Sequence, residues 1–299
     1  MVSRTLKPYA RFTSGSATFS FHLGDCVQVL ERLPAGTVDA IVTSPPYNLG
    51  IRYRSYDDTL PRGEYLAWTA EWVKRAAHVL SADGSLFLNV GGKPTDPWTA
   101  IDIAQATRPY LHLQNTIHWI KSIAIEKSLA GARAGLLDDL AVGHYKPINS
   151  RRFLNDAHEY VFHFTPHGET PIDRHAIGVP YQDRSDIGRW RTAGSGVRCR
   201  GNTWFIPYET IQSRAKDRPH PATFPPKLPE MCLKLNGLGR TRTVADPFLG
   251  LGSTGVACAQ LGLSFIGIEM DEGYLKEAID RTRAALATRE RGATRADKR

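Results

Sequence analysis

The sequence predicts an α/β protein with a mostly parallel, doubly wound sheet. Segments with the apolar pattern of strands alternate with segments of helical periodicity along most of the chain, as expected for strand–helix–strand units. A glycine-rich turn over residues 246–255 follows one predicted strand and opens a helix, and a proline-rich turn over residues 43–48 ends another strand. Ligands of doubly wound sheets bind beyond the carboxyl ends of the strands, so the two turns mark the expected site.

Each predicted element has a local signal. Apolar runs next to turn residues predict strands over residues 18–23, 39–43, 85–90, 116–120, 159–164, 243–245 and 263–268. Apolar residues at helical spacing predict helices over residues 26–33, 64–80, 99–106, 226–235, 253–261 and 273–286. Pro34 ends the first of these helices, because proline cannot continue the hydrogen-bond ladder.

The middle of the chain departs from this regular order. Between residues 165 and 202, Gly, Pro, Arg and Asp are frequent and the periodicity is lost, which indicates a variable insertion rather than core. Residues 122–157 are irregular in part and could extend it. We therefore expect one folded domain over residues 1–164 and 203–287, this insertion, and a flexible basic tail over residues 288–299.

Composition limits the function classes. The chain has 299 residues, of which 41% are hydrophobic and 23% charged, enough for a large α/β domain. It has no apolar run long enough for a membrane helix and no secretory signal pattern. The spacing of Cys26, Cys199, Cys232 and Cys258 fits neither a zinc site nor a disulfide framework, so we expect a reducing, cytosolic location and no metal. The net charge of +8 favours nucleic acid as partner, although many basic proteins bind none.

The glycine-rich turn has the residues of a nucleotide site. Gly250 and Gly252 allow close backbone approach to a ligand, and the helix that follows favours a negative group at its start. Glu269 ends the next strand, where an acid can bind ribose hydroxyls. No Gly-Lys-Ser/Thr follows, which argues against a nucleoside triphosphatase loop. The alternative interpretation is a tight structural turn.

The proline-rich turn presents two oxygen atoms. After a buried strand, Pro45 and Pro46 hold the backbone rigid, so that the Ser44 hydroxyl and the Pro45 carbonyl can face one point as acceptors. Tyr47 supplies a flat face for stacking. Alone, this segment is equally compatible with a proline-stiffened loop.

Together, the Ser44-Pro45-Pro46-Tyr47 and Asp246-Pro247-Phe248-Leu249-Gly250-Leu251-Gly252-Ser253 motifs resemble those of the amino-methylating DNA methyltransferases. The catalytic motif comes first and the cofactor motif lies near the C-terminus, an order similar to the permuted β class of that family. Residues 24–26, 115–121, 155–164 and 220–225 resemble further family segments. The resemblance covers nearly the whole chain except residues 165–202, where the family's target-recognition segment falls.

The resemblance implies a Rossmann-like, S-adenosylmethionine-dependent methyltransferase sheet with a circularly permuted motif order. It assigns Asp246 to the amino-acid end of the cofactor, Glu269 to the ribose and Asp25 to the adenine amino group, with Phe248 packed nearby. The full set of cofactor-binding residues that we expect is Asp25, Cys26, Thr43, Phe224, Asp246, Pro247, Phe248, Gly250, Gly252, Ser253, Thr254 and Glu269.

The implied reaction methylates an exocyclic amine, a poor nucleophile because its lone pair is delocalised into the ring. Acceptors at Ser44 and Pro45 favour a tetrahedral nitrogen with a free lone pair, which attacks the sulfonium methyl group directly. The base must be flipped from the duplex, and Tyr47 is the expected stacking partner. Ser44, Pro45, Pro46 and Tyr47 are therefore the predicted catalytic residues. Methylation at cytosine C5 needs a thiolate, and no cysteine follows a proline in a comparable loop.

Double-stranded DNA is the expected partner, bound through arginines in and near the insertion. Tyr181 and Trp190 lie among them. The alternative is a solvated charged loop. We interpret His118, His158 and His163 as structural. The predicted DNA-binding residues are Arg151, Arg152, Arg184, Arg189, Arg191, Arg198 and Arg200.

Several alternatives stay open. Family members with Ser at position 44 tend towards cytosine N4 and those with Asp towards adenine N6, so we expect cytosine N4 with adenine N6 as the alternative. A non-catalytic DNA-binding protein, or an enzyme acting on RNA or protein, are further hypotheses. The resemblance implies the cytoplasm of a prokaryote, with association to the nucleoid, and leaves open a homodimer and a restriction endonuclease as genetic partner.

Overall fold

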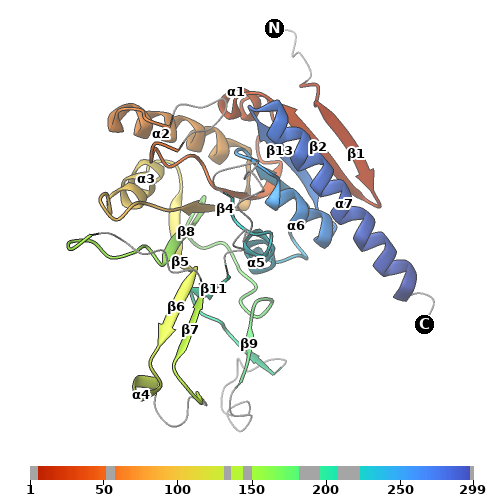
Figure 1. The fold of residues 1–299 in the computed structure, drawn as a ribbon. Helices are drawn as coiled ribbons and strands as arrows, with labels where there is room; N and C mark the ends of the chain where they lie inside the picture. Colours follow the sequence, from red (N-terminus) through yellow and green to blue (C-terminus); the bar gives the residue numbers. More distant parts are fainter. Residues whose placement is uncertain are drawn as a thin grey trace.

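The computed structural model describes residues 6–51, 58–130, 136–143, 150–181, 196–207 and 223–296. These residues form an α/β fold around a nine-stranded sheet in the order β1-β2-β13-β12-β3-β4-β8-β5-β11 (Figure 1). Five neighbouring strands, β2, β13, β12, β3 and β4, are parallel, whereas β1 and β8 run antiparallel to their neighbours. The predicted fold class is confirmed.

The strands agree with the sequence pattern and extend it. The predicted strands are β2 (Ala17–Leu23), β3 (Val38–Thr43), β4 (Leu80–Val90), β5 (His112–Ile120), β8 (His158–Thr165), β12 (Thr243–Asp246) and β13 (Ser264–Glu269). The sequence patterns did not indicate the two edge strands, β1 (Ala10–Ser14) and β11 (Thr203–Phe205). Both are short and partly exposed, so neither has the continuous apolar run of a central parallel strand.

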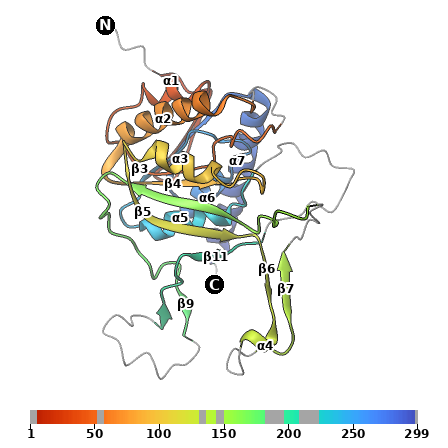
Figure 2. The same cartoon turned by 90° about the vertical axis from the view of Figure 1, so that its left-hand side faces the viewer.

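Helices cover both faces of the sheet. One face carries α1 (Cys26–Leu30), α2 (Arg62–Val79) and α3 (Thr99–Thr107), which pack through residues such as Leu30, Trp72 and Ile103. The other carries α5 (Lys227–Asn236), α6 (Ser253–Leu261) and α7 (Glu272–Ala296), packed through residues such as Leu233 and Leu275 (Figures 1 and 2). Two separate hydrophobic cores result, as a doubly wound sheet requires. None of the described helices is long and apolar enough to cross a lipid bilayer.

Two small structures project from one side of the sheet. The hairpin of β6 (Ser122–Ile125) and β7 (Leu140–Gly143), with α4 (Lys127–Ala130), lies beyond the end of β5. The second consists of the antiparallel strands β9 (Val179–Pro180) and β10 (Val197–Arg198). Both figures show the hairpin and β9 extending away from the helical layers in the same general direction (Figures 1 and 2).

Two sequence expectations need correction. Residues 165–178 belong to the packed body rather than to an insertion outside the core, because Thr165 and Thr170 are buried and Ile177 joins the core. Residues 288–296 are not a frayed tail, because α7 continues to Ala296. Contacts with the sheet and with α6 hold this extension: Ser14 Oγ donates to Glu290 Oε1 (2.8 Å) and Arg289 Nη1 to Ala259 O (3.4 Å).

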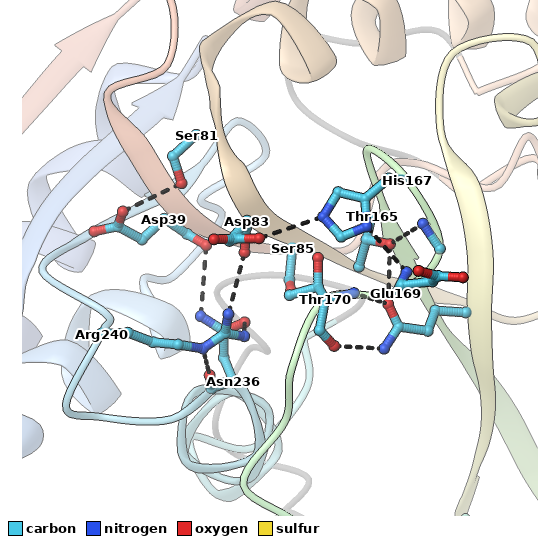
Figure 3. A network of polar contacts seen from close by, with 12 residues as sticks. Asp39, Ser81, Asp83, Ser85, Thr165, His167, Glu169, Thr170, Asn236 and Arg240 are labelled. Carbon is cyan, nitrogen blue, oxygen red and sulfur yellow. Dashed lines mark hydrogen bonds and ion pairs between the residues drawn. The ribbon is translucent and has the colours of Figure 1, made fainter.

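A polar network closes the edge of the sheet where β3 and β4 begin (Figure 3). The carboxylate of Asp39 accepts from Ser81 Oγ (3.3 Å), and its main-chain carbonyl accepts from the side-chain amide of Asn236 (3.5 Å). Arg240 donates to the main-chain carbonyl of Asp83 (3.4 Å). His167 contacts the Asp83 carboxylate (3.3 Å). These contacts tie α5 and the turn after β8 to the amino end of the sheet and leave the carboxyl end open for a site.

Nearby, His163 has the structural role expected of it. Its ring lies between Ser85 Oγ (3.0 Å) and the Asn115 amide (2.9 Å), stacked on Phe87. Burial lowers the pKa of His163 to about 3, so this histidine is neutral at physiological pH.

Candidate active site

A pocket lies at the carboxyl ends of β2, β13, β12 and β3 and encloses about 1010 Å³, counting the part open to solvent. Parallel strands place the residues that follow them at one edge of the sheet. Because β12 and β3 are neighbours, the glycine-rich turn and the proline-rich turn lie side by side. The two motifs are distant in the sequence, and together they line this single pocket.

Asp246 lies beneath the pocket and does not line it. Its side chain is 1% exposed; Oδ1 accepts from Thr43 Oγ1 (2.6 Å) and from the Phe248 amide (3.1 Å), and Oδ2 accepts from Thr254 Oγ1 (2.7 Å). Burial raises the pKa of Asp246 to about 6, against the opposing effect of these hydrogen bonds. Asp246 thus fastens β3, the turn and the start of α6 together from below.

The two glycines of the turn have different tasks. Gly250 lines the pocket, and its amide donates to Glu269 Oε2 (2.8 Å). Gly252 has φ of +77°, and a Cβ there would lie 2.8 Å from Cβ of Ala278. Close packing of the turn on α7, in a left-handed conformation, therefore requires Gly252, which is absent from the pocket lining.

Glu269 lines the pocket next to the turn. Besides Gly250, the amides of Met270 and Asp271 donate to its Oε1, each at 2.9 Å. Burial raises the pKa of Glu269, while these three amides act in the opposite direction. The amides fix the orientation of the carboxylate, and its remaining lone pairs can accept from ligand hydroxyls.

Aromatic side chains form one wall. Phe248 and Trp68 both line the pocket and meet edge to face at 5.5 Å, and Phe248 also packs against Trp72 at 5.2 Å. Tyr65, in contact with Trp68, donates its hydroxyl to the carbonyl of Pro46 (2.7 Å). Helix α2 thereby positions both turns against one apolar surface.

The proline-rich turn is anchored on both sides. Asn48 has φ of +58°, and the buried carboxylate of Asp58 accepts from the amides of Asn48 (2.8 Å), Leu49 and Ile51 (both 3.0 Å). Burial raises the pKa of Asp58. This carboxylate stabilises the chain reversal that follows Tyr47.

The side chain of Tyr47 is more deeply buried than expected for a ring that offers a free face for stacking. It lines the pocket but is only 8% exposed, and its hydroxyl lies 2.6 Å from Ser44 Oγ and 3.3 Å from Asn89 Oδ1. The hydroxyl group thus belongs to a polar cluster behind the pocket, and the ring forms part of the wall.

The structure divides the expected cofactor residues into two groups. Asp25, Cys26, Phe224, Pro247, Phe248, Gly250, Ser253 and Glu269 line the pocket, as do all four residues from Ser44 to Tyr47. Thr43, Asp246, Gly252 and Thr254 lie outside the lining and support it. Of the resembling segment 220–225, residues 220–222 lie outside the described residues. The thiol of Cys26 has its pKa raised by burial, which disfavours a reactive thiolate.

Several lining residues were not among the catalytic or cofactor-binding residues expected from the sequence. Gly24, Thr223, Leu249 and Leu251 lie within the motifs and resembling segments without an expected role, and Trp68, Ile268, Met270, Asp271 and Tyr274 lie outside them. Met270, Asp271 and Tyr274 follow the predicted ribose-binding Glu269, so the strand-to-helix turn after the acid was a usable signal. The sequence held no such signal for Trp68, because its position at helical spacing indicates only a residue of the hydrophobic core.

Of the expected DNA-binding arginines, Arg184, Arg189 and Arg191 lie outside the described residues. Arg151, Arg152 and Arg198 are exposed. Arg200 is half-buried and donates through Nε to the carbonyl of Ile177 (2.9 Å), which gives it a structural contact. Among the described residues, no group of three or more His, Cys, Asp or Glu side chains could hold a metal ion, and all four cysteines are free.

A doubly wound sheet with these two turns at adjoining strand ends defines the class of amino-methylating methyltransferases. The chain belongs to the N6/N4 DNA methylase family, whose model matches residues 38–280. This confirms the resemblance drawn from the two motifs.

Relatives and fold neighbours agree with this assignment. The chain is 28% identical to the type II methyltransferase M.ScaI of Streptomyces caespitosus, over 87% of this chain and 80% of that protein. It is 27% identical to M.XycI of Xanthomonas campestris pv. cyanopsidis, over 94% and 92%. The fold matches the PvuII DNA methyltransferase (cytosine-N4-specific), with TM-score 0.59 and 18% identity over 95% of this chain and 96% of that one. It also matches the Thermus thermophilus protein TTHA0409, solved with S-adenosyl-L-methionine, with TM-score 0.55 and 22% identity over 89% and 93%.

Proposed function

We propose that this DNA methylase transfers the methyl group of S-adenosyl-L-methionine to N4 of a cytosine flipped out of double-stranded DNA. The observation that supports it best is the joining of the Ser44–Tyr47 turn and the Pro247–Gly250 turn in one pocket. One turn presents acceptors for an amine, and the other has the backbone and acid of a nucleotide site.

The pocket residues suit this cofactor. The pocket volume of about 1010 Å³, which includes the part open to solvent, is ample for a nucleoside with an amino-acid chain. Glu269 offers acceptors for ribose hydroxyls, Asp25 an acceptor near the amino end of α1, and Phe248 with Trp68 an apolar surface. When bound, the cofactor supplies an electrophilic methyl group on a sulfonium sulfur. A Thermus thermophilus protein of the same fold was solved in complex with this molecule.

The chain's own residues activate the amine. Ser44 and Pro45 line the pocket at the end of β3, and oxygen acceptors for both N–H groups favour the tetrahedral nitrogen whose lone pair attacks. Tyr65 holds the carbonyl of Pro46 at 2.7 Å, which keeps the turn in place during the reaction. The ring of Tyr47 forms the wall against which the flipped base packs.

Cytosine rather than adenine is proposed because Ser occupies position 44. A neutral hydroxyl at this position is typical of the family's cytosine-N4 members, and the PvuII enzyme of similar fold is described as specific for that atom. Adenine N6 is the alternative within the same family.

We place the DNA against the face from which the β6–β7 hairpin and the β9–β10 strands project. Exposed Arg151 and Arg152 lie between the hairpin and β8, and exposed Arg198 belongs to β10. Arginine suits both phosphate and guanine contacts. That a homodimer forms, or that a restriction endonuclease accompanies the enzyme, stays a prediction.

The deciding experiment incubates plasmid DNA with the purified protein and S-adenosyl-L-methionine, digests it to nucleosides and identifies the product by mass spectrometry. N4-methylcytosine supports the proposal. N6-methyladenine alone would move the target to adenine and keep the reaction class. Absence of both across varied DNA substrates, with cofactor binding retained, would favour a non-catalytic DNA-binding protein.

A further inference from the structure

Behind the proline-rich turn, a chain of polar groups leads away from the pocket, and the methyl transfer as proposed above uses none of the groups beyond Tyr47. It runs from Ser44 through Tyr47 to Asn89 at the end of β4, and on to Glu159 at the start of β8. Because β8 is antiparallel to β4, the first residues of β8 lie beside the last residues of β4. Glu159 thus reaches the back of the pocket.

The direction of each hydrogen bond follows from Asn89. Its amide nitrogen lies 3.0 Å from Glu159 Oε2 and 3.1 Å from the carbonyl oxygen of Tyr160. A carbonyl oxygen can only accept a hydrogen bond, and the same holds for the oxygens of an ionised carboxylate. The carbonyl oxygen of Asn89 must therefore face the hydroxyl of Tyr47, at 3.3 Å.

Tyr47 consequently donates towards Asn89 and Glu159, since both atoms near it on that side are acceptors: Asn89 Oδ1 at 3.3 Å and Glu159 Oε2 at 3.4 Å. At the 2.6 Å contact with Ser44 the tyrosine oxygen then accepts and the serine hydroxyl donates. The proton of Ser44 is turned away from the pocket, so its lone pairs are available to an incoming amine.

The close approach of these groups depends on Gly91. A methyl group at this position would lie 3.0 Å from Cε2 of Tyr47 and 3.1 Å from Cδ of Glu159, closer than side chains normally approach. The other oxygen of Glu159 accepts from the Nζ of Lys121 at the end of β5. The side chain of Glu159 is 15% exposed, so the carboxylate is in contact with solvent, whereas the pocket for the base must exclude water.

We propose that Ser44, Tyr47 and Glu159 form a proton relay that removes the proton released when the amine is methylated. As the new N–C bond forms, one N–H bond of the amine breaks and its electron pair stays on nitrogen. The proton passes to Ser44 Oγ, the proton of Ser44 passes to the hydroxyl oxygen of Tyr47, and the proton of Tyr47 passes to Oε2 of Glu159. Asn89 positions the relay, and the proton leaves to solvent from Glu159.

The inference rests on the proposed function, and its test is a single-turnover methyl-transfer assay over a range of pH. Glu159→Gln should lower the rate by about 10²-fold, the usual contribution of a proton acceptor, and abolish the acid limb of the pH–rate profile. The other titratable groups that face Glu159 are Lys121, Tyr47, Asp156 and His158, with His118 of β5 against His158. His158→Asn is therefore the matched control and should keep the acid limb.

Two further measurements separate a relay from a purely structural role. In a double-mutant cycle, Tyr47→Phe and Glu159→Gln should not add, because either change interrupts the same path. Binding of S-adenosyl-L-methionine, followed by calorimetry, should stay within about twofold of wild type in both variants. Glu159 lies outside the pocket lining, and Tyr47→Phe keeps the ring that forms the wall.

A wild-type rate for Glu159→Gln, a retained acid limb, or fully additive losses would overturn the relay while leaving the methyltransferase proposal intact. If the wild-type protein itself transfers no methyl group to any DNA, both proposals fall. If Glu159→Gln does not fold, Tyr47→Phe and Gly91→Ala give the same test, because each interrupts the relay at another point.

Discussion

Thr43 Oγ1 donates a 2.6 Å hydrogen bond to Oδ1 of Asp246. This contact joins the end of β3, where the proline-rich turn begins, to the end of β12, where the glycine-rich turn begins. Both residues are buried, at 0% and 1% exposure. The two motifs of the site are thus locked together beneath the pocket, by residues that do not line it.

Thr43→Val should therefore destabilise the fold. The substitution keeps the side-chain shape but removes one of the donors to a buried carboxylate, at a cost of about 1–3 kcal/mol in the free energy of unfolding. Urea denaturation followed by circular dichroism measures this loss. Thr13→Val, at an exposed position of β1, is the control and should change stability little. Equal stability of the two variants would contradict the locking role of Thr43.

Asp246 should make stability fall as pH rises through about 6. Burial raises its pKa to about 6 from 3.8, so between these values the folded state holds a proton that the unfolded chain has released. The stability contribution is complete below about pH 4 and lost above about pH 6, with an amplitude of about 3 kcal/mol. The protonated form is accommodated because Thr254 can turn its own hydroxyl to the carbonyl of Val42, 3.2 Å away.

Asp246→Asn tests this dependence. An amide at position 246 can donate to Thr254 without titrating, so the fall in stability between about pH 4 and about pH 7 should flatten in this variant. Asp280→Asn, on the exposed face of α7, should keep the wild-type slope. Urea midpoints at several pH values give the comparison, and an unaltered slope in Asp246→Asn would assign the dependence to other groups.

Glu269→Gln should weaken cofactor binding by about 10- to 100-fold. Three backbone amides orient the carboxylate. Glutamine places an NH₂ group against at least one of these donors, which turns the side chain and removes an acceptor from the ribose hydroxyls, a loss of about 1–3 kcal/mol in binding. Calorimetric titration with S-adenosyl-L-methionine measures the effect, and Asp280→Asn again serves as control. Undiminished affinity would remove Glu269 from the cofactor site.

Neutralising Arg151 and Arg152 together should flatten the salt dependence of DNA binding. Each phosphate contact adds about 0.9 to the slope of log K against log salt, so Arg151→Gln with Arg152→Gln should reduce the slope by up to about 2. The exposed Arg11 and Arg32, changed to Gln, provide a control of equal charge on β1 and after α1. Equal slopes for both double variants would place the DNA elsewhere on the surface.

Much of the fold could be predicted from the chain because its central elements are locally consistent. The buried parallel strands β3 and β13 contain the apolar runs 40–42 and 265–268, and α6 runs from Ser253 to Leu261 as the periodicity predicted. The edge strand β1 and the extension of α7 to Ala296 were not predicted, because they are held by contacts between residues distant in the sequence, such as Ser14 with Glu290.

The sequence by itself determined the family and the chemistry, since the two turn motifs are contiguous and each residue type has a local reason to be there. Only the tertiary structure decided which of those residues face the pocket. It moved Asp246 and Gly252 beneath the lining, because a buried carboxylate surrounded by donors and a glycine packed on Ala278 are defined by neighbours from other elements. It also brought Glu159 behind Tyr47, 112 positions away, since the antiparallel direction of β8 places its first residues at the carboxyl end of β4.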